Sequence, residues 1–216
     1  MNPHDQSVLA WQEGGQARSA RWRSEAGWPP PARLQTADDQ IPADVAYRLA
    51  CEGTALLWRG DFQNARQLLQ ALGRRLDRVP RKAPPPPASP TEAFHRHRQA
   101  QGRRARVLGM VLIDLDGAYG IGLRRAPDLR AACEEAWGPT DGQPSVAALR
   151  ELLGLVGAHE WRKKGVEIPA LGPPPGNRIH PHYGVFSPVR GEYLDLIARA
   201  PLPPGCALAW DVGTGT

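Results

Sequence analysis

The chain has 216 residues and a formal net charge of +5, with 41% hydrophobic and 23% charged residues. These proportions are close to those of globular proteins, and the length fits one sizeable domain or two small ones. The longest strongly apolar run, Val107–Ile113, is far shorter than the ~20 residues that cross a bilayer, which excludes a membrane-spanning helix. The polar first residues predict no secretory signal, and three scattered cysteines favour a cytoplasmic location over a disulfide framework.

Residues 1–40 show no sustained hydrophobic period. Trp11, Trp22 and Trp28 are spread among polar and small residues, and Pro29–Pro31 closes the segment. We therefore predict a poorly ordered extension over residues 1–40. The alternative for its tryptophans is that they dock onto the main body of the protein.

Residues 41–83 are predicted to form a helical hairpin, whose first helix reaches residue 57. Asp61 is a favourable N-cap for the second helix, because apolar residues recur at helical spacing from Phe62 to Leu76. A proline-rich linker over residues 84–90 follows, since consecutive prolines favour an extended and semi-rigid chain.

Residues 91–178 are predicted to form an α/β region. Ser89 and Glu92 have the spacing of a capping box, which indicates the start of a helix. The apolar run Val107–Leu115 is typical of a buried strand. The other predicted elements are a strand at Tyr119–Leu123 that pairs with it, helices that begin near Pro127 and Ser145, and a short strand within Gly165–Leu171.

The last six residues, Asp211–Thr216, carry the strongest functional signal, the sequence D-V-G-T-G-T. They follow a predicted helix over Glu192–Ala200 and a predicted parallel strand over Cys206–Val212. Glycines after such a strand let the backbone approach a ligand, and the next helix presents its free amides there. The pattern therefore favours a nucleotide-type cofactor turn, with an ordinary glycine turn as the alternative.

The segment His180–Pro188, the predicted helix, the strand and the glycine motif together resemble the class I S-adenosylmethionine-dependent methyltransferases, most closely the "methyltransferase small" branch. The resemblance covers residues 178–216. It implies S-adenosyl-L-methionine as cofactor and the start of a Rossmann-like domain over residues 179–216, with residues 91–178 as a substrate-recognition region. The positions that match the family's cofactor-binding residues are Asp211, Gly213 and Gly215 of the glycine motif and Phe186 and Pro188 of the V-F-x-P segment.

The same resemblance implies that the chain is the N-terminal part of such an enzyme. The third glycine of the motif, the carboxylate that holds the ribose and the N-P-P-aromatic segment would follow Thr216. We therefore expect the catalytic residues beyond Thr216, and only weak cofactor binding without methyl transfer by these 216 residues alone. The methyl acceptor is expected to be a macromolecule, either a protein or a nucleic acid, with no membrane partner.

A second signal is the basic segment, residues 74–106, where ten Arg or Lys residues are opposed only by Asp77 and Glu92. Such a run can neutralise nucleic-acid phosphates. It supports an alternative function as a non-catalytic nucleic-acid or ribosome-binding module, and a solvated helix face is the plainer interpretation. A third possibility is a different dinucleotide-binding enzyme, because glycine turns are shared between cofactor classes.

Two pairs of polar residues are given structural roles. Asp114 and Asp116 lie at the predicted end of a strand, where aspartate commonly stabilises a turn. His180 and His182 lack nearby cysteines or clustered acids, so they are expected to orient a loop, and no metal site is predicted.

Overall fold

The computed structural model describes residues 7–78, 85–185, 192–201, 203–208 and 210. The chain divides into two compact units. Unit 1 contains residues 1–130 and 140–153, and unit 2 contains residues 131–139 and 154–216. The fold is mixed α/β, which confirms the predicted class at that level.

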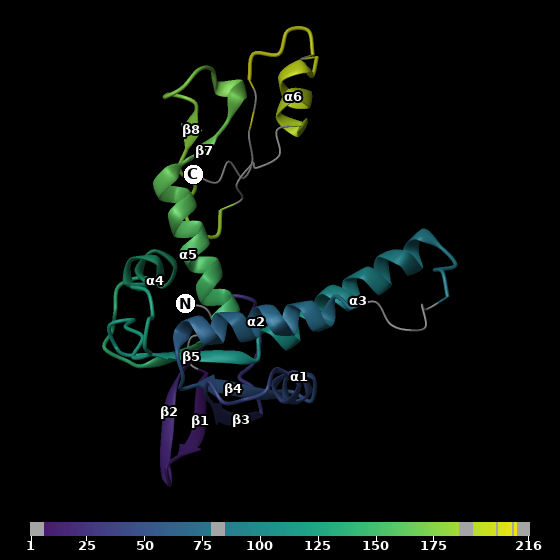
Figure 1. Ribbon diagram of the computed structural model, residues 1–216. Helices are drawn as coiled ribbons and strands as arrows, with labels where there is room; N and C mark the ends of the chain where they lie inside the picture. Colours follow the sequence, from purple (N-terminus) through teal and green to yellow (C-terminus); the bar gives the residue numbers. More distant parts are fainter. Residues whose placement is uncertain (1–6, 79–84, 186–191, 202, 209, 211–216) are drawn as a thin grey trace. The chain divides into compact units, whose positions relative to one another are not determined.

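Unit 1 is built on one six-stranded sheet with the order β1-β2-β6-β5-β4-β3 (Figure 1). The strands β3, β4 and β5 are parallel neighbours, whereas β1 pairs with β2 and β5 pairs with β6 in antiparallel fashion. The pair β2 and β6 is parallel. The strands are β1 (Val8–Glu13), β2 (Gln16–Arg23), β3 (Arg33–Ala37), β4 (Thr54–Trp58), β5 (Val111–Leu115) and β6 (Ser145–Ala148).

Helices connect the parallel strands of unit 1, as parallel pairing requires. Helix α1 (Ala43–Cys51) joins β3 to β4, and α2 (Phe62–Leu76) and α3 (Pro90–Leu108) lie between β4 and β5 in the chain. Helix α1 contacts β4, α2 and α3, and α2 contacts α3. All five residues of β4 are buried, because a strand with parallel neighbours on both sides has both faces covered.

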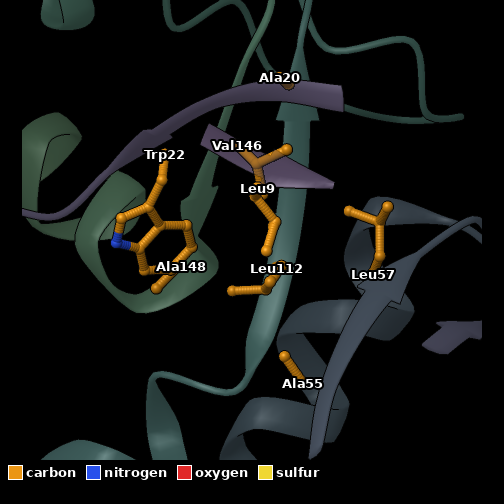
Figure 2. Close-up of a cluster of buried hydrophobic side chains, with 8 residues drawn as sticks. All are labelled: Leu9, Ala20, Trp22, Ala55, Leu57, Leu112, Val146 and Ala148. Carbon is orange, nitrogen blue, oxygen red and sulfur yellow. The ribbon is translucent and has the colours of Figure 1, made fainter. Parts of the chain in front are cut away.

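The sheet curls, so that its edge strands β1 and β3 contact each other. Inside the curl lies an apolar cluster to which all six strands contribute, with Leu34 of β3 packed against its margin. Figure 2 shows the side chains of Leu9 and Leu112 meeting between Trp22 and Leu57. The buried members are Leu9, Ala20, Trp22, Ala55, Leu57, Leu112, Val146 and Ala148.

Ion pairs connect strands of the curled sheet. Arg59, which directly follows β4, donates to both carboxylate oxygens of Glu13 in β1, at 2.5 and 2.8 Å. The same guanidinium lies 2.9 Å from the carboxylate of Asp114 in β5. The hydrogen bonds from Arg59 lower the pKa of Glu13 from 4.5 to about 2, so this carboxylate is ionised at neutral pH.

The N-terminal region differs from the prediction of a poorly ordered extension over residues 1–40, because it supplies β1, β2 and β3. Gly14 and Gly15 form the two-residue turn between β1 and β2. Both have positive φ, which two-residue hairpin loops favour. Only one large apolar side chain is buried in each of β1 and β2, Leu9 and Trp22, so the alternation of these strands is weak in the sequence. Docking of Trp22 onto the main body is confirmed, since it is 7% exposed.

The predicted helical hairpin over residues 41–83 is wrong, because β4 lies between α1 and α2. A short apolar run such as Ala55–Trp58 has no period that separates a buried strand from a helix. The second helix is confirmed, and Asp61 caps it by accepting a hydrogen bond from the Gln63 amide at 2.8 Å. Residues 79–84 lie outside the described residues. They include the end of the predicted hairpin and the first residue of the predicted linker.

Three further predictions in unit 1 are corrected. The run Val107–Leu115 is divided, because its first two residues complete α3 and β5 begins at Val111. Ser145 begins β6 instead of capping a helix, since it pairs with Leu115 across the antiparallel ladder. The predicted strand Tyr119–Leu123 is a turn and loop, in which the Asp116 amide donates to the Gly120 carbonyl.

Unit 2 contains short elements around the second part of helix α5 (Leu149–Lys164). Helix α4 begins three residues after the predicted start at Pro127. The strand predicted within Gly165–Leu171 is only two residues long and pairs antiparallel with β8. The elements of unit 2 are α4 (Arg130–Trp137), β7 (Val166–Glu167), the 3-10 helix η2 (Pro169–Leu171), β8 (Arg178–Ile179) and α6 (Glu192–Arg199).

Candidate functional site

The predicted cofactor residues themselves, Asp211, Gly213, Gly215, Phe186 and Pro188, lie outside the described residues. The helix predicted between Pro188 and Asp211 is confirmed as α6 (Glu192–Arg199).

The strand predicted over Cys206–Val212 is corrected where it is described. Residues 206–208 and 210 are in no helix or strand, and the Cys206 amide donates to the Pro203 carbonyl in a turn. A strand needs a neighbour to pair its backbone groups, and no described segment pairs with these residues. Residues 209, 211 and 212 lie outside the described part.

The chain around the predicted cofactor segment exposes large apolar side chains. Leu196 and Ile197 of α6 and Leu208 are each 68% exposed, and Trp210 is 83% exposed. Neighbouring exposed apolar residues of this size commonly mark a surface that another layer of protein or a ligand covers. The segment before the glycine motif therefore has the apolar character of a buried element without being buried among the described residues.

The two histidines of the H-P-H segment both contact Arg162, near the end of α5. The ring nitrogen Nδ1 of His180 lies 2.6 Å from the Arg162 carbonyl, and Nε2 of His182 lies 3.3 Å from its guanidinium. Among the described residues, no three His, Cys, Asp or Glu side chains gather closely enough to hold a metal ion. The contacts agree with the predicted role of these histidines in orienting the loop.

Arg162 also belongs to a charged group that joins α5 to α4. Glu135 lies 2.8 Å from Nδ1 of His159 and 3.2 Å from the Arg162 guanidinium, and its side chain is 10% exposed. Burial opposes ionisation of Glu135, but hydrogen bonds from His159 and Arg162 outweigh it and place its pKa below the usual value. A carboxylate held ionised in this way is suited to binding cations and unsuited to donating a proton at neutral pH.

Gly165 ends α5 and allows His180 to approach. Its φ of +73° lies in the left-handed region, and a Cβ added there would be 2.8 Å from Cε1 of His180. Gly165→Ala should therefore destabilise unit 2 by about 1 kcal/mol or more, because strain and a clash combine. Gly157→Ala, in the same helix with open space around it, should instead stabilise by up to about 1 kcal/mol. Urea unfolding of both variants checks this, and equal effects would contradict it.

The carboxyl ends of β3, β4 and β5 form a second polar site, in unit 1. Asp61 has a fully buried side chain and lies 2.9 Å from the Arg124 guanidinium and 2.6 Å from that of Arg125. Its own amide donates to the Asp39 carboxylate at 3.0 Å. The hydrogen bond from Arg125 is the largest cause that lowers the pKa of Asp61 from 3.8 to about 2. Ligands commonly bind at this end of α/β sheets, but here the carboxylates hold loops together.

Asp114 and Asp116 do not form a carboxylate pair. Asp114 pairs with Arg59, whereas Asp116 accepts hydrogen bonds from the Ala118 and Gly120 amides at 2.8 and 2.7 Å. The turn predicted after β5 is therefore confirmed, and neither side chain is placed to act as a general acid or base with the other.

The basic segment divides into paired and unpaired arginines. Arg75 pairs with Asp44, Arg96 with Glu92 and Arg104 with Asp77. The described residues that make no ion pair with another described residue include Arg74, Arg78 and Arg98, and all three are exposed. Both carboxylates within the segment, those of Asp77 and Glu92, thus already form ion pairs with arginines. The remaining arginines leave an excess of positive charge at the surface.

Comparison with family models, with curated proteins and with solved structures finds no match to this chain. None of the helices in the described part of the chain combines the length and apolar character that crossing a lipid bilayer requires.

Sequence reasoning did not find the partners that join distant segments. The pairs Glu13–Arg59 and Asp61–Arg125 are separated by 46 and 64 residues, so no local spacing signals them. The Gly14-Gly15 dipeptide was an available signal for the first hairpin, because such dipeptides are typical of two-residue turns.

Proposed function

We propose that this protein is an S-adenosylmethionine-dependent methyltransferase that acts on a macromolecule, with a Rossmann-like cofactor domain that begins near residue 179. The observation that carries the proposal is the order of elements before the glycine motif. Helix α6 forms where the resemblance requires a helix, and the exposed apolar residues Leu208 and Trp210 directly precede Asp211. Residues 206–208 and 210 form no strand, so these exposed apolar side chains support the proposal only as a surface that further protein or a ligand would cover.

Bound S-adenosyl-L-methionine supplies an activated methyl group on a positively charged sulfonium. The residues that would hold it are Asp211, Gly213 and Gly215, together with Phe186 and Pro188. The glycines leave the backbone uncovered, so that a charged and polar ligand can come close to the amides. Much of the catalysis of such a transfer lies in positioning the acceptor and excluding water.

The alternative function, a non-catalytic nucleic-acid or ribosome-binding module, is favoured by a different observation. Helix α3 is exposed over most of its length, with only Val107 and Leu108 buried. The two functions are compatible, because an enzyme that methylates a macromolecule also needs a surface that binds it.

Cofactor binding tests the proposal. In the product of the whole gene, with any residues that follow Thr216 included, Asp211→Ala should weaken S-adenosyl-L-methionine binding by about tenfold to a hundredfold, because one charge-assisted hydrogen bond is lost. Gly213→Val should abolish binding, since a branched side chain blocks the backbone. Isothermal titration calorimetry measures both. Asp195→Ala, an exposed carboxylate of α6, is the matched control and should bind normally.

The measurement has an outcome that removes the proposal. If the whole gene product does not bind S-adenosyl-L-methionine, or if both variants bind as the unaltered protein does, the motif is an ordinary glycine turn. The cofactor assignment then fails, and the binding-module alternative remains to be tested by itself.

A further inference from the structure

Helix α3 is exposed to solvent along most of its length. Its buried residues are confined to the last two positions, Val107 and Leu108, and Phe94 is 59% exposed. The exposed residues of its first three turns lie on all sides of the helix. These residues are Pro90, Thr91, Phe94, His95, His97, Arg98, Gln99, Ala100 and Gln101.

Local contacts keep this exposed helix formed. The Ser89 hydroxyl accepts from the Glu92 amide at 3.1 Å, and the Glu92 carboxylate accepts from the Ala88 amide at 2.7 Å. Arg96 pairs with Glu92 one turn later at 2.5 Å and donates to the Pro85 carbonyl at 2.6 Å. Isolated helices of this length are marginal in water, so capping and the ion pair supply the order that packing does not.

One side of α3 carries a basic stripe, which we define as His95, Arg98 and Arg106, with Gly102 between the two arginines. The spacings of three, four and four residues place them on one face, away from Val107 and Leu108. The guanidinium of Arg106 lies over the Trp28 ring, 6.0 Å from its centroid. A Cβ at Gly102 would meet nothing within 4 Å, so packing does not require glycine there. A ligand that approaches the helix backbone would use this gap.

We propose that the basic stripe of α3 binds the major groove of double-stranded DNA. The exposed part of the helix, Pro90–Gln101, is about 18 Å long, and a helix with side chains is about 10–12 Å across. That diameter matches the roughly 12 Å major groove of B-form DNA, whereas the A-form RNA major groove is deep and narrow. The exposed first three turns leave the helix accessible to both walls of a groove.

The side chains on α3 suit this partner. Arg98 carries no ion pair with a described residue, so its guanidinium is available for phosphates or guanine. Gln99 and Gln101 are exposed amides of the type that pairs with adenine. Phe94 is the only aromatic ring of the helix besides the imidazoles, so a stacking platform for single strands is absent from it. The inference names duplex DNA as the methyl acceptor, and that part of it rests on the proposed function. Binding of DNA by α3 does not depend on methyl transfer.

Fluorescence anisotropy of a labelled duplex DNA of mixed sequence tests the inference without the cofactor. For three phosphate contacts, we expect affinity to fall about 40-fold between about 50 and about 200 mM salt. Arg98→Ala should weaken binding about tenfold and flatten the log–log salt slope by about 0.9. Arg74→Ala is the matched control, because it removes the same charge from an exposed arginine of α2 that makes no ion pair with a described residue and lies outside the basic stripe.

Each outcome bears on the inference. Binding that weakens equally in both variants, or no binding at low salt, overturns it, provided that circular dichroism shows α3 intact. Equal or tighter binding of duplex RNA, or displacement of DNA by polyglutamate at equal charge, overturns the groove assignment in favour of RNA or of bare charge. Cofactor binding is measured separately by calorimetry, so a loss of the proposed function and a loss of this inference are distinguishable.

Discussion

Leu112→Ala is expected to destabilise unit 1 by about 2–5 kcal/mol, the usual cost of emptying a buried leucine site. Leu112 is fully buried in β5, opposite Leu57 on one side and Ala148 on the other. The surrounding side chains come from strands that are fixed by their ladders, so they cannot easily collapse into the cavity. The free energy of unfolding in urea measures the effect.

Val8→Ala provides the matched control for this prediction, because Val8 is an apolar strand residue of β1 that is 61% exposed. Its loss should change the free energy of unfolding by no more than about 0.5 kcal/mol. Equal costs at the two positions would contradict the arrangement in which the sheet curls around Leu112.

Asp61→Asn is expected to lower the melting temperature by several degrees at neutral pH. Asparagine keeps the shape of the side chain and can still cap α2, but it removes the charge that Arg124 and Arg125 share. The buried site would then hold a neutral group in a place organised for a carboxylate. The loop at residues 124–125 should loosen together with the start of α2, because the Phe62 amide donates to the Arg124 carbonyl.

The pH dependence of this variant follows from the lowered pKa. The pKa of Asp61 in the folded protein is about 2, below its usual 3.8. Its contribution to stability is therefore fully present above about pH 4 and is lost as the pH falls through about 2. Thermal melting of the two proteins should differ at pH 7 and converge near pH 2. A difference that stays constant over this range would contradict the ion-pair explanation.

Asp128→Asn is the matched control for Asp61. Asp128 also accepts a hydrogen bond from the amide two residues later, that of Arg130, at 3.0 Å. Its side chain is 71% exposed and lies 3.9 Å from a single guanidinium, so its charge is largely screened by solvent. The melting temperature of this variant should stay close to that of the unaltered protein at every pH.

Signals that act within a few residues are the ones that the sequence determined by itself. Asp61 and Ser89 cap helices because each side chain reaches an amide two or three residues ahead, and no distant partner is needed. The helical spacing of Phe62–Leu76 and the mixed α/β class follow in the same way. The cofactor residues Asp211, Gly213 and Gly215 stay a prediction from the motif.

The tertiary structure alone decided which short apolar runs are strands. Residues Ala55–Trp58 and Ser145–Ala148 carry too few residues to show a period, and their state depends on the neighbours with which their backbones pair. Trp22 lies opposite Val146, and Leu115 opposite Ser145, in ladders that join segments far apart in the chain. Only when those segments meet are the backbone groups satisfied and the side chains buried, which is why β4 and β6 could not be found from local patterns.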